Sequence, residues 1–465
     1  MCGIIGLVNE GQNAATDLYV GLLAMQHRGK ESAGIVIQSA NDLVKLNGMG
    51  EVPQVFFEES LASLNGSIGI GQVRYSTFGD TAYENIPPAR GKFRGFDFYL
   101  AHNGNLVNVN ELRKITHSRP KSSDTQVIAD LISDSSAVDF TEAVVETLLK
   151  LRGSFNLIFI FNETLYAFRD SFGFHPLQLG KRGNNYIIAS ESCVFSHLGA
   201  ELVKDFSPGE LIIINKDGIQ NHQIFPSNLK FDIFEYIYFL RPDSIVHGVE
   251  AGLARYFMGR ALAEEHPVLA DVMIPIPDSG NEAALGYYEY MLDKKIRMEF
   301  RPWALFRPHT VSRTFIEPVQ SKREYYLHLK FNPRPLQLKG KSVLAIDDSL
   351  VRGNTIARVI KLLKNAGARS VSVLVASPMY RFPDFYGIDT YRVKDEIIAK
   401  KLNGDLRRVK ETLGIDHLNY LSMEKTIDSV LKARGENSVL TKDNFYTGPF
   451  TGEYPAGAGD FSAEN

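Results

Sequence analysis

The sequence predicts two domains of different class, an α+β domain followed by an α/β domain. A length of 465 residues exceeds what one hydrophobic core usually serves. The first half contains short apolar runs and amphipathic stretches in separate blocks, which is typical of antiparallel sheets layered with helices. The second half contains the order strand, loop, helix, strand, which is typical of a βαβ unit in a parallel sheet.

In the first half, apolar runs bounded by Gly, Asn and Asp predict strands at residues 2–8, 34–38, 67–73, 96–101, 155–161, 186–189 and 211–214. Helical periodicity predicts helices at residues 15–26, 124–133 and 138–151. The polar stretch 216–230 has the composition of a linker. We therefore expect the first domain to span residues 2–228 and the second, with a C-terminal extension, residues 229–465.

In the second half, apolar strands are predicted at residues 272–276, 342–346 and 371–376, and a helix is predicted at residues 283–291. A second helix is predicted to end before Gly367, because apolar residues follow the spacing i, i+3, i+4, i+7 at Ile356, Val359, Ile360 and Leu363. The tail after Tyr454 is expected to be frayed, since it is rich in Gly, Ala and Ser.

Composition and charge are those of an ordinary globular protein. Hydrophobic residues make up 44% and charged residues 23%, and a net charge of −3 gives no reason to expect nucleic acid or a membrane as a partner. The only two cysteines, Cys2 and Cys193, make a disulfide framework implausible and favour a reducing compartment. We find neither a transmembrane run nor a signal peptide, so we expect a cytoplasmic protein.

Cys2 is the first candidate for a catalytic residue. A cysteine in an apolar run is usually a buried structural thiol, and we interpret Cys193 in this way. Cys2 differs because it directly follows Met1, and a small second residue permits removal of the methionine. The α-amine that is then freed titrates near about pH 8, so it can accept the thiol proton as the sulfur attacks.

Five segments, in order, resemble the N-terminal-nucleophile glutaminase domain. They are Cys-Gly-Ile-Ile-Gly at residues 2–6, the segment 26–34 around His-Arg-Gly, the segment 71–77 around Arg74, His-Asn-Gly-Asn at residues 102–105, and Ser-Asp-Thr at residues 123–125. Two positions depart from the family pattern, since Lys30 replaces Gln and Gln72 replaces His. The resemblance implies an αββα sandwich with an N-terminal nucleophile.

The resemblance also implies a role for each polar residue. Cys2 is the nucleophile, Arg74 binds the α-carboxylate of glutamine, and Asp124 binds its α-ammonium group. Asn103 and the N–H of Gly104 hold the oxyanion. Each residue has a structural alternative as well: Arg74 in a surface ion pair, Asp124 as a helix N-cap, and Asn103-Gly104 as a hairpin turn. The order of all five segments favours the glutaminase interpretation.

Residues 343–355 form the most specific stretch of the chain. Apolar residues predict a buried strand that ends in Asp347 and Asp348, and a loop containing Gly353 leads into a helix. This pattern suits a phosphorylated sugar, because carboxylates bind ribose hydroxyls and Mg²⁺, and N–H groups at a helix start bind phosphate. A plain βα loop with two solvated acids is the structural alternative.

The stretch resembles the phosphoribosyl diphosphate motif of type I phosphoribosyltransferases. The resemblance implies an α/β phosphoribosyltransferase domain with Mg²⁺ at Ser279, Asp347 and Asp348. It also implies a set of residues that bind phosphoribosyl diphosphate: Asp347, Asp348, Ser349, Val351, Arg352, Gly353, Asn354 and Thr355, with Arg313 from a mobile loop.

One family joins these halves in this order, the glutamine phosphoribosylpyrophosphate amidotransferases (amidophosphoribosyltransferases), and the resemblance covers nearly the whole chain. It implies that glutamine, water and phosphoribosyl diphosphate give 5-phosphoribosylamine, glutamate and pyrophosphate, the first step of purine synthesis. Ammonia is expected to travel internally between the two sites. Family members are homodimers or homotetramers inhibited by purine nucleotides, and we carry both properties over as expectations.

Two departures from the family pattern bear on function. The four cysteines that bind an iron–sulfur cluster in many members align with Asp232, Asp384, Tyr446 and Pro449, so we expect a cluster-free member, with no propeptide before Cys2. The mobile loop is altered over residues 307–312, and His175 stands where Arg is common. A regulatory paralogue that binds the phosphorylated ligand, and a glutaminase that feeds another acceptor, remain open alternatives.

Overall fold

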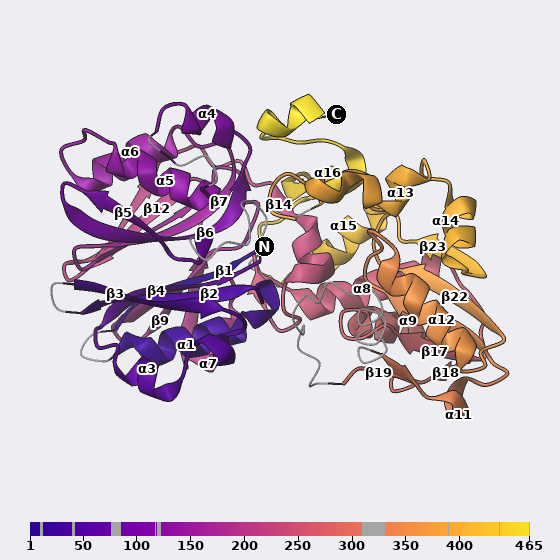
Figure 1. Cartoon of the computed structure of the whole chain (residues 1–465). Helices are drawn as coiled ribbons and strands as arrows, with labels where there is room; N and C mark the ends of the chain where they lie inside the picture. The colour runs from indigo at the N-terminus through magenta and orange to yellow at the C-terminus, as the bar shows by residue number, and fades with distance from the viewer. Residues whose placement is uncertain are drawn as a thin grey trace.

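The computed structural model describes residues 1–9, 13–39, 42–75, 85–116, 118, 122–308, 331–388, 390–436 and 438–464. Figure 1 shows two bodies side by side, the N-terminal half of the chain on the left and the C-terminal half on the right. The N-terminus lies at the junction between them. Within the described ranges, no helix has both the length and the apolar character needed to cross a membrane.

Two stacked antiparallel sheets form the centre of the N-terminal half. The first has the strand order β11 (Glu201–Asp205), β9 (Gln178–Arg182), β10 (Asn185–Ala189), β1 (Gly3–Val8), β4 (Ile68–Arg74), β2 (Ser32–Ser39), β3 (Asp42–Met49). The second has the order β13 (Gly218–Gln223), β12 (Glu210–Asn215), β8 (Thr164–Arg169), β7 (Gly153–Phe161), β6 (Phe96–Leu106), β5 (Ala89–Phe93).

Helices cover the outer face of each sheet (Figure 1). The first sheet is covered by α1 (Ala14–Ala24), α2 (Val52–Val55), α3 (Glu58–Ala62) and α7 (Cys193–His197). The second is covered by α4 (Val109–Arg113), α5 (Asp124–Ser133) and α6 (Phe140–Leu148). The layers therefore follow the order helix, sheet, sheet, helix, and the predicted αββα sandwich is confirmed.

Strand β1 shows how the sequence specifies these layers. Ile4 lies in the apolar core between the two sheets, whereas Ile5 and Leu7 lie in the core beneath α1. Successive residues of a strand point to opposite faces, so a strand covered on both faces must be apolar at every position. Residues 3–7 meet this requirement and are fully buried.

A parallel sheet forms the centre of the C-terminal half. Its strand order is β18 (Glu299–Phe300), β17 (Val272–Pro275), β21 (Ser342–Asp347), β22 (Ser370–Val375), β23 (His417–Tyr420). One face packs against α8 (Ala251–Glu265), α9 (Asn281–Asp293) and α15 (Met423–Lys432). The other face packs against α12 (Asn354–Asn365), α13 (Ile398–Lys401) and α14 (Leu406–Leu413). The predicted α/β class is confirmed.

Short elements connect these layers. The helical ones are η1 (Gln26–Arg28), η3 (Glu235–Phe239), α11 (Pro335–Leu338), η4 (Tyr391–Glu396), η5 (Lys442–Asn444), α16 (Gly448–Thr451) and η6 (Gly459–Glu464). The extended ones pair as β14 (Phe231–Asp232) with β24 (Phe445–Tyr446), β15 (Ile245–Val246) with β16 (Val249–Glu250), and β19 (Leu305–Phe306) with β20 (Asn332–Pro333). The β14–β24 pair ties the start of the C-terminal half to its end.

The structure corrects three expectations. The stretch expected to be a linker contains β13, which pairs with β12 along its whole length although its outward side chains are polar. The strand predicted at residues 96–101 continues to Leu106, through a polar segment that apolar patterning does not detect. The tail after Tyr454 is not frayed over its described part, because Phe461 stacks on Phe385 and the N–H of Asp460 donates to the Val107 carbonyl.

Candidate active sites

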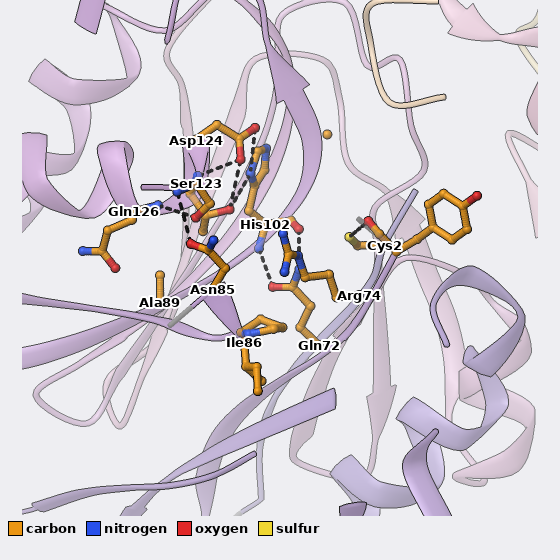
Figure 2. A pocket seen from close by; sticks show the side chains of 14 residues that line it. Cys2, Gln72, Arg74, Asn85, Ile86, Ala89, His102, Ser123, Asp124 and Gln126 are labelled. Carbon is orange, nitrogen blue, oxygen red and sulfur yellow. Dashed lines mark hydrogen bonds and ion pairs between the residues drawn. The ribbon is translucent and has the colours of Figure 1, made fainter. Parts of the chain in front are cut away.

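A cavity of about 470 Å³ lies at the ends of β1, β4 and β6 in the N-terminal half. Its lining comes from five separate parts of the chain: Cys2, Gln72, Arg74, Tyr75, Asn85, Ile86, Pro87, Ala89, His102, Gly104, Ser123, Asp124, Thr125 and Gln126. Figure 2 shows the labelled side chains of this set gathered around the opening. Four of the five residues predicted for the glutaminase site, Cys2, Arg74, Gly104 and Asp124, line this one cavity.

Cys2 precedes β1 and is buried. Its backbone nitrogen donates a hydrogen bond to Asn103 Oδ1 at 2.9 Å, and its Sγ lies 3.7 Å from the Tyr75 carbonyl oxygen. Met1 is still attached and is only 3% exposed. Removal of Met1 would turn the nitrogen held by Asn103 into an α-amine on the same residue as the thiol. Such an amine lies within reach of the sulfur proton.

Asn103 and Gly104 lie within β6, where they pair with Asn156 and Phe155 of β7, so the hairpin-turn alternative is wrong. Gly104 has φ +153°, and a Cβ there would lie 2.0 Å from the Ser154 carbonyl oxygen, so only glycine fits. Asn103 Nδ2 is buried and has no hydrogen-bond partner among the described residues. A buried donor without a partner destabilises the fold, so its presence calls for an explanation. A site prepared for an oxyanion needs such a free donor.

Arg74 and Asp124 bring opposite charges to the same cavity. Arg74 is the last residue of β4, is buried, and places Nη1 3.4 Å from Glu31 Oε1. Asp124 is the first residue of α5, and the cap of that helix is Ser123, whose Oγ accepts from Gln126 N at 3.2 Å. The surface ion-pair and N-cap alternatives are therefore wrong, because Arg74 is buried and the capping role belongs to Ser123.

Gln72 and His102 belong to the site although no role was predicted for either. The Gln72 side chain donates to the His102 carbonyl at 2.9 Å and accepts from the His102 N–H at 3.0 Å, which links the two sheets next to Asn103. Burial lowers the pKa of His102, so the ring is neutral at neutral pH. The sequence marked Gln72 only as a departure from a family pattern, since the contact depends on how the sheets stack.

The second site lies at the carboxyl ends of the parallel strands, where α/β sheets usually bind ligands. Asp347 is the last residue of β21, and Asp348 follows it, with its N–H donating to Asp347 Oδ1 at 3.0 Å. Ser279, in the loop after β17, donates its hydroxyl to Asp348 Oδ2. Burial raises the pKa of the Asp348 carboxyl. Two of the predicted metal positions are thus in direct contact, and the third is adjacent.

The predicted phosphate loop connects β21 to α12. Gly353 has φ +78° and caps α12, so the helix begins at Asn354 and presents the N–H groups of its first turn at the loop. The Val351 carbonyl accepts from Ile398 N at 3.0 Å, and Arg352 Nη1 lies 3.3 Å from Glu396 Oε2. Ser349 donates to Asp348 Oδ1 at 2.5 Å, and Thr355 is exposed on the first turn of α12.

Of the altered loop at residues 307–312, the structure describes Arg307 and Pro308. Arg307 Nη1 lies 2.6 Å from Asp278 Oδ2, beside Ser279, so this arginine contacts the loop after β17. Arg313 and the rest of that loop lie outside the described residues. Pro308, which belongs to the altered stretch 307–312, is the last described residue before the gap at 309–330.

The donor atoms of the second site suit a hard cation that takes most of its ligands from water and substrate. Asp347, Asp348 and Ser279 supply oxygen only, which is the chemistry Mg²⁺ prefers. Among the described residues no group of three or more His, Cys, Asp or Glu side chains is arranged to hold a metal alone. The diphosphate of a substrate would have to complete such a site.

The four positions aligned with cluster cysteines are packed as a protein core. Asp384 Oδ1 accepts from the Tyr446 hydroxyl at 2.8 Å, and its Oδ2 accepts from the N–H groups of Tyr386 and Ile388, each at 2.8 Å. Asp232 is fully buried near Asp384, and burial raises the pKa of both carboxyls. The four aligned positions therefore carry two acids, a tyrosine and a proline, and none of them is a thiol.

Comparisons with known proteins agree with this geometry. Residues 92–197 match the model of the glutamine amidotransferase domain family. Amidophosphoribosyltransferase from Staphylococcus aureus (strain MRSA252) is 38% identical, covering 99% of this chain and 92% of that protein. The protein of the same name from Methanocaldococcus jannaschii is 39% identical over 92% of this chain and 94% of its own.

A solved structure shows the same architecture over the full chain. Glutamine phosphoribosylpyrophosphate amidotransferase from B. subtilis, complexed with ADP and GMP, superposes with a TM-score of 0.88 at 34% identity, covering 98% of this chain and 97% of that one. The match includes both the N-terminal-nucleophile hydrolase domain and the phosphoribosyltransferase domain. With relatives this similar over nearly their whole length, the chain belongs to the amidophosphoribosyltransferase family.

Proposed function

We propose that the chain is a glutamine-dependent amidophosphoribosyltransferase of de novo purine synthesis. It converts glutamine, water and phosphoribosyl diphosphate into 5-phosphoribosylamine, glutamate and pyrophosphate. The observation that carries the proposal is that one chain contains both a cysteine whose nitrogen is bonded to Asn103, an amide with an unpaired buried Nδ2, and adjacent carboxylates before a loop that opens a helix. Residues 2–228 are assigned to the first reaction and residues 229–465 to the second.

The first reaction releases ammonia from glutamine at Cys2. The α-amine of Cys2, freed by removal of Met1 and held by Asn103 Oδ1, accepts the thiol proton while Sγ attacks the side-chain amide. Asn103 Nδ2 and the Gly104 N–H donate to the oxyanion that forms. The amine returns the proton to the leaving ammonia, and water then hydrolyses the glutamyl thioester to give glutamate.

Arg74 and Asp124 select the amino-acid end of glutamine. The Arg74 guanidinium pairs with the α-carboxylate and the Asp124 carboxylate with the α-ammonium group, and both line the cavity that Cys2 enters. Fixing both charged groups places the amide carbon at the sulfur and excludes amides without an amino-acid end.

The second reaction joins ammonia to the sugar. Asp347 and Asp348 accept hydrogen bonds from the ribose hydroxyls, and the loop from Ser349 to Thr355 receives the 5-phosphate at the start of α12. Ser279, Asp347 and Asp348 would hold Mg²⁺, which would supply charge neutralisation for the leaving pyrophosphate. Arg313 is assigned to the same diphosphate. Ammonia attacks C1, the bond to pyrophosphate breaks, and one proton is lost from nitrogen.

Several properties of the whole protein follow as proposals. The chain is a cluster-free member, because acids and a tyrosine occupy the aligned positions and pack closely. The B. subtilis relative was solved with ADP and GMP, so we propose purine nucleotides as inhibitors here, and a homodimer or homotetramer as the assembly. Both cysteines are free thiols, which suits a cytoplasmic location.

Cys2→Ala should abolish glutamine-dependent pyrophosphate release, by at least about 10³-fold, the scale on which enzymes lose activity with their nucleophile. Release with ammonium salts should remain, because the second site is untouched. A glutamine-analogue alkylator should add once to the native chain and not to the variant, as measured by intact mass.

Cys193→Ala is the matched control. Burial, followed by the Glu191 charge, raises the pKa of Cys193 to about 12, so this thiol is not a nucleophile at neutral pH. The variant should keep the adduct and the activity. An adduct on Cys193, or full glutamine-dependent activity in Cys2→Ala, would sink the assignment of the nucleophile.

Gly104→Ala should lower glutamine-dependent activity by about 10²-fold or more, the usual cost of a lost oxyanion donor. The added methyl meets the β7 backbone, so β6 must shift away from β7 and carry Asn103 and the Gly104 N–H with it. Gly183→Ala is the control, since its φ is also positive, at +59°, but a Cβ there would have no heavy atom within 4 Å. Equal effects of both changes on glutamine hydrolysis would show that strain alone explains the loss.

Asp348→Asn should reduce pyrophosphate release with either glutamine or ammonium by about 10²-fold, because a neutral amide no longer stabilises the charge of the transition state. Glutamine hydrolysis at Cys2 should persist. Asp395→Asn removes an exposed acid of the same domain and should change neither rate. A native chain that releases no pyrophosphate with either nitrogen source would instead favour the regulatory or plain glutaminase alternative.

A further inference from the structure

A short segment of the second domain contacts the catalytic strands of the first. Two successive carbonyls of segment 385–387 each accept a hydrogen bond from a glutaminase-domain side chain that remains after Met1 is removed: Asn105 Nδ2 to Phe385 O at 2.8 Å and His175 Nε2 to Tyr386 O at 2.7 Å. The first donor lies two residues after Asn103. The second donor, His175, has no assigned role.

The His175 ring faces an acceptor on both sides. Nε2 lies against the Tyr386 carbonyl, and Nδ1 lies 3.1 Å from Glu235 Oε1. A carbonyl can only accept, and Glu235 is ionised: burial alone would raise its pKa, but Arg28 and His175 hold it below the usual value. A ring with an acceptor at each nitrogen must donate from both, which only the imidazolium does. In a neutral ring, the lone pair of the unprotonated nitrogen would face the lone pairs of the Tyr386 carbonyl oxygen or of Glu235 Oε1.

The charges around the ring support a cation there. Arg28 Nη2 lies 2.7 Å from Glu235 Oε2, and Arg28 also binds Glu191, so two cations and two carboxylates alternate in a region with almost no solvent exposure. Balanced charges are the condition under which buried ions persist. Three further titratable groups interact electrostatically with the His175 ring: the carboxyls of Asp170 and Asp384, and the His102 imidazole.

The backbone of His175 is bound to the oxyanion strands. Its carbonyl accepts from Arg169 Nε at 2.9 Å and from Asn156 Nδ2 at 3.3 Å. Asn156 is the β7 residue that pairs with Asn103 of β6. The carbonyl of His175 therefore belongs to the frame of the glutaminase site, while its ring, only 1% exposed, is bound to two groups of the second domain.

We propose that His175 is a positioning residue that, as an imidazolium, locks the oxyanion strands of the glutaminase domain to the second domain and so keeps ammonia release coupled to its use. The inference rests on the proposed two-site function. Loss of one donor would leave the Tyr386 carbonyl without its side-chain partner, or leave Glu235 with Arg28 alone, and buried groups left unpaired favour local separation of the surfaces that hold them.

His175→Gln tests the proposal, because an amide can donate to one acceptor only and carries no charge. The measurement is the coupling ratio, pyrophosphate released per glutamate formed. We expect a ratio at least about threefold lower than in the native chain, with ammonium-dependent release within about twofold of native. His175→Arg keeps a charge with several donors and should retain more of the native ratio than His175→Gln does.

His27→Gln is the matched control. His27 Nε2 lies 2.7 Å from Glu191 Oε1 at the rim of the same charge network, but it is partly exposed and bonded to neither acceptor of His175. The coupling ratio of His27→Gln should equal that of the native chain. A native ratio in His175→Gln would overturn the proposal. If the native chain released no pyrophosphate with either nitrogen source, that result would instead contradict the proposed function.

The protonation state gives a second readout that does not depend on a variant's activity. In the full chain labelled with ¹⁵N-histidine, which holds 11 histidines, the ring signal absent from His175→Gln or His175→Arg should show both nitrogens protonated at pH 7. A neutral tautomer at that position would contradict the inference.

Discussion

The hydrogen bond from the Cys2 nitrogen to Asn103 Oδ1 joins the start of β1, the middle strand of one sheet, to β6 of the other, and the proposed glutaminase site depends on it. The Asn103 amide holds the Cys2 nitrogen through its oxygen, while its buried Nδ2 has no partner among the described residues, and we propose that this donor is left for the oxyanion of the substrate. The bond is possible only because Gly104 lets β6 run close to β7, and because Gln72 holds the His102 backbone from the facing sheet.

The two domains use different physical means for their two reactions. The sandwich supplies a pocket whose lining side chains come from both sheets, and fixed donors in such a pocket suit attack on a neutral amide. The parallel sheet supplies strand ends and a helix start, where carboxylates and N–H groups meet a charged sugar phosphate. Ammonia in neutral water is mostly protonated and no longer nucleophilic, so the contact between the domains matters as much as either site. Segment 385–387 is part of that contact.

Local patterns predicted much of this structure. The apolar run at residues 2–8 predicted β1, and the acids after a second apolar run located the end of β21. Motif order predicted the glutaminase residues, and the structural alternatives for Arg74, Asp124 and Asn103-Gly104 could be rejected only from the structure. The sequence could not reveal that Gln72 bridges two sheets or that His175 meets Tyr386, because both contacts join distant parts of the chain. Polar β13 and the polar end of β6 lack the apolar signal on which strand prediction rests.

The most direct test of a two-site synthase is the fate of the amide nitrogen. The native chain would be given glutamine labelled with ¹⁵N at the amide, phosphoribosyl diphosphate, and an excess of unlabelled ammonium, and the amine of the trapped product would be analysed by mass spectrometry. Internal transfer predicts that the product carries ¹⁵N whatever the ammonium concentration. A product whose label follows the isotope ratio of the free ammonium pool would contradict the account.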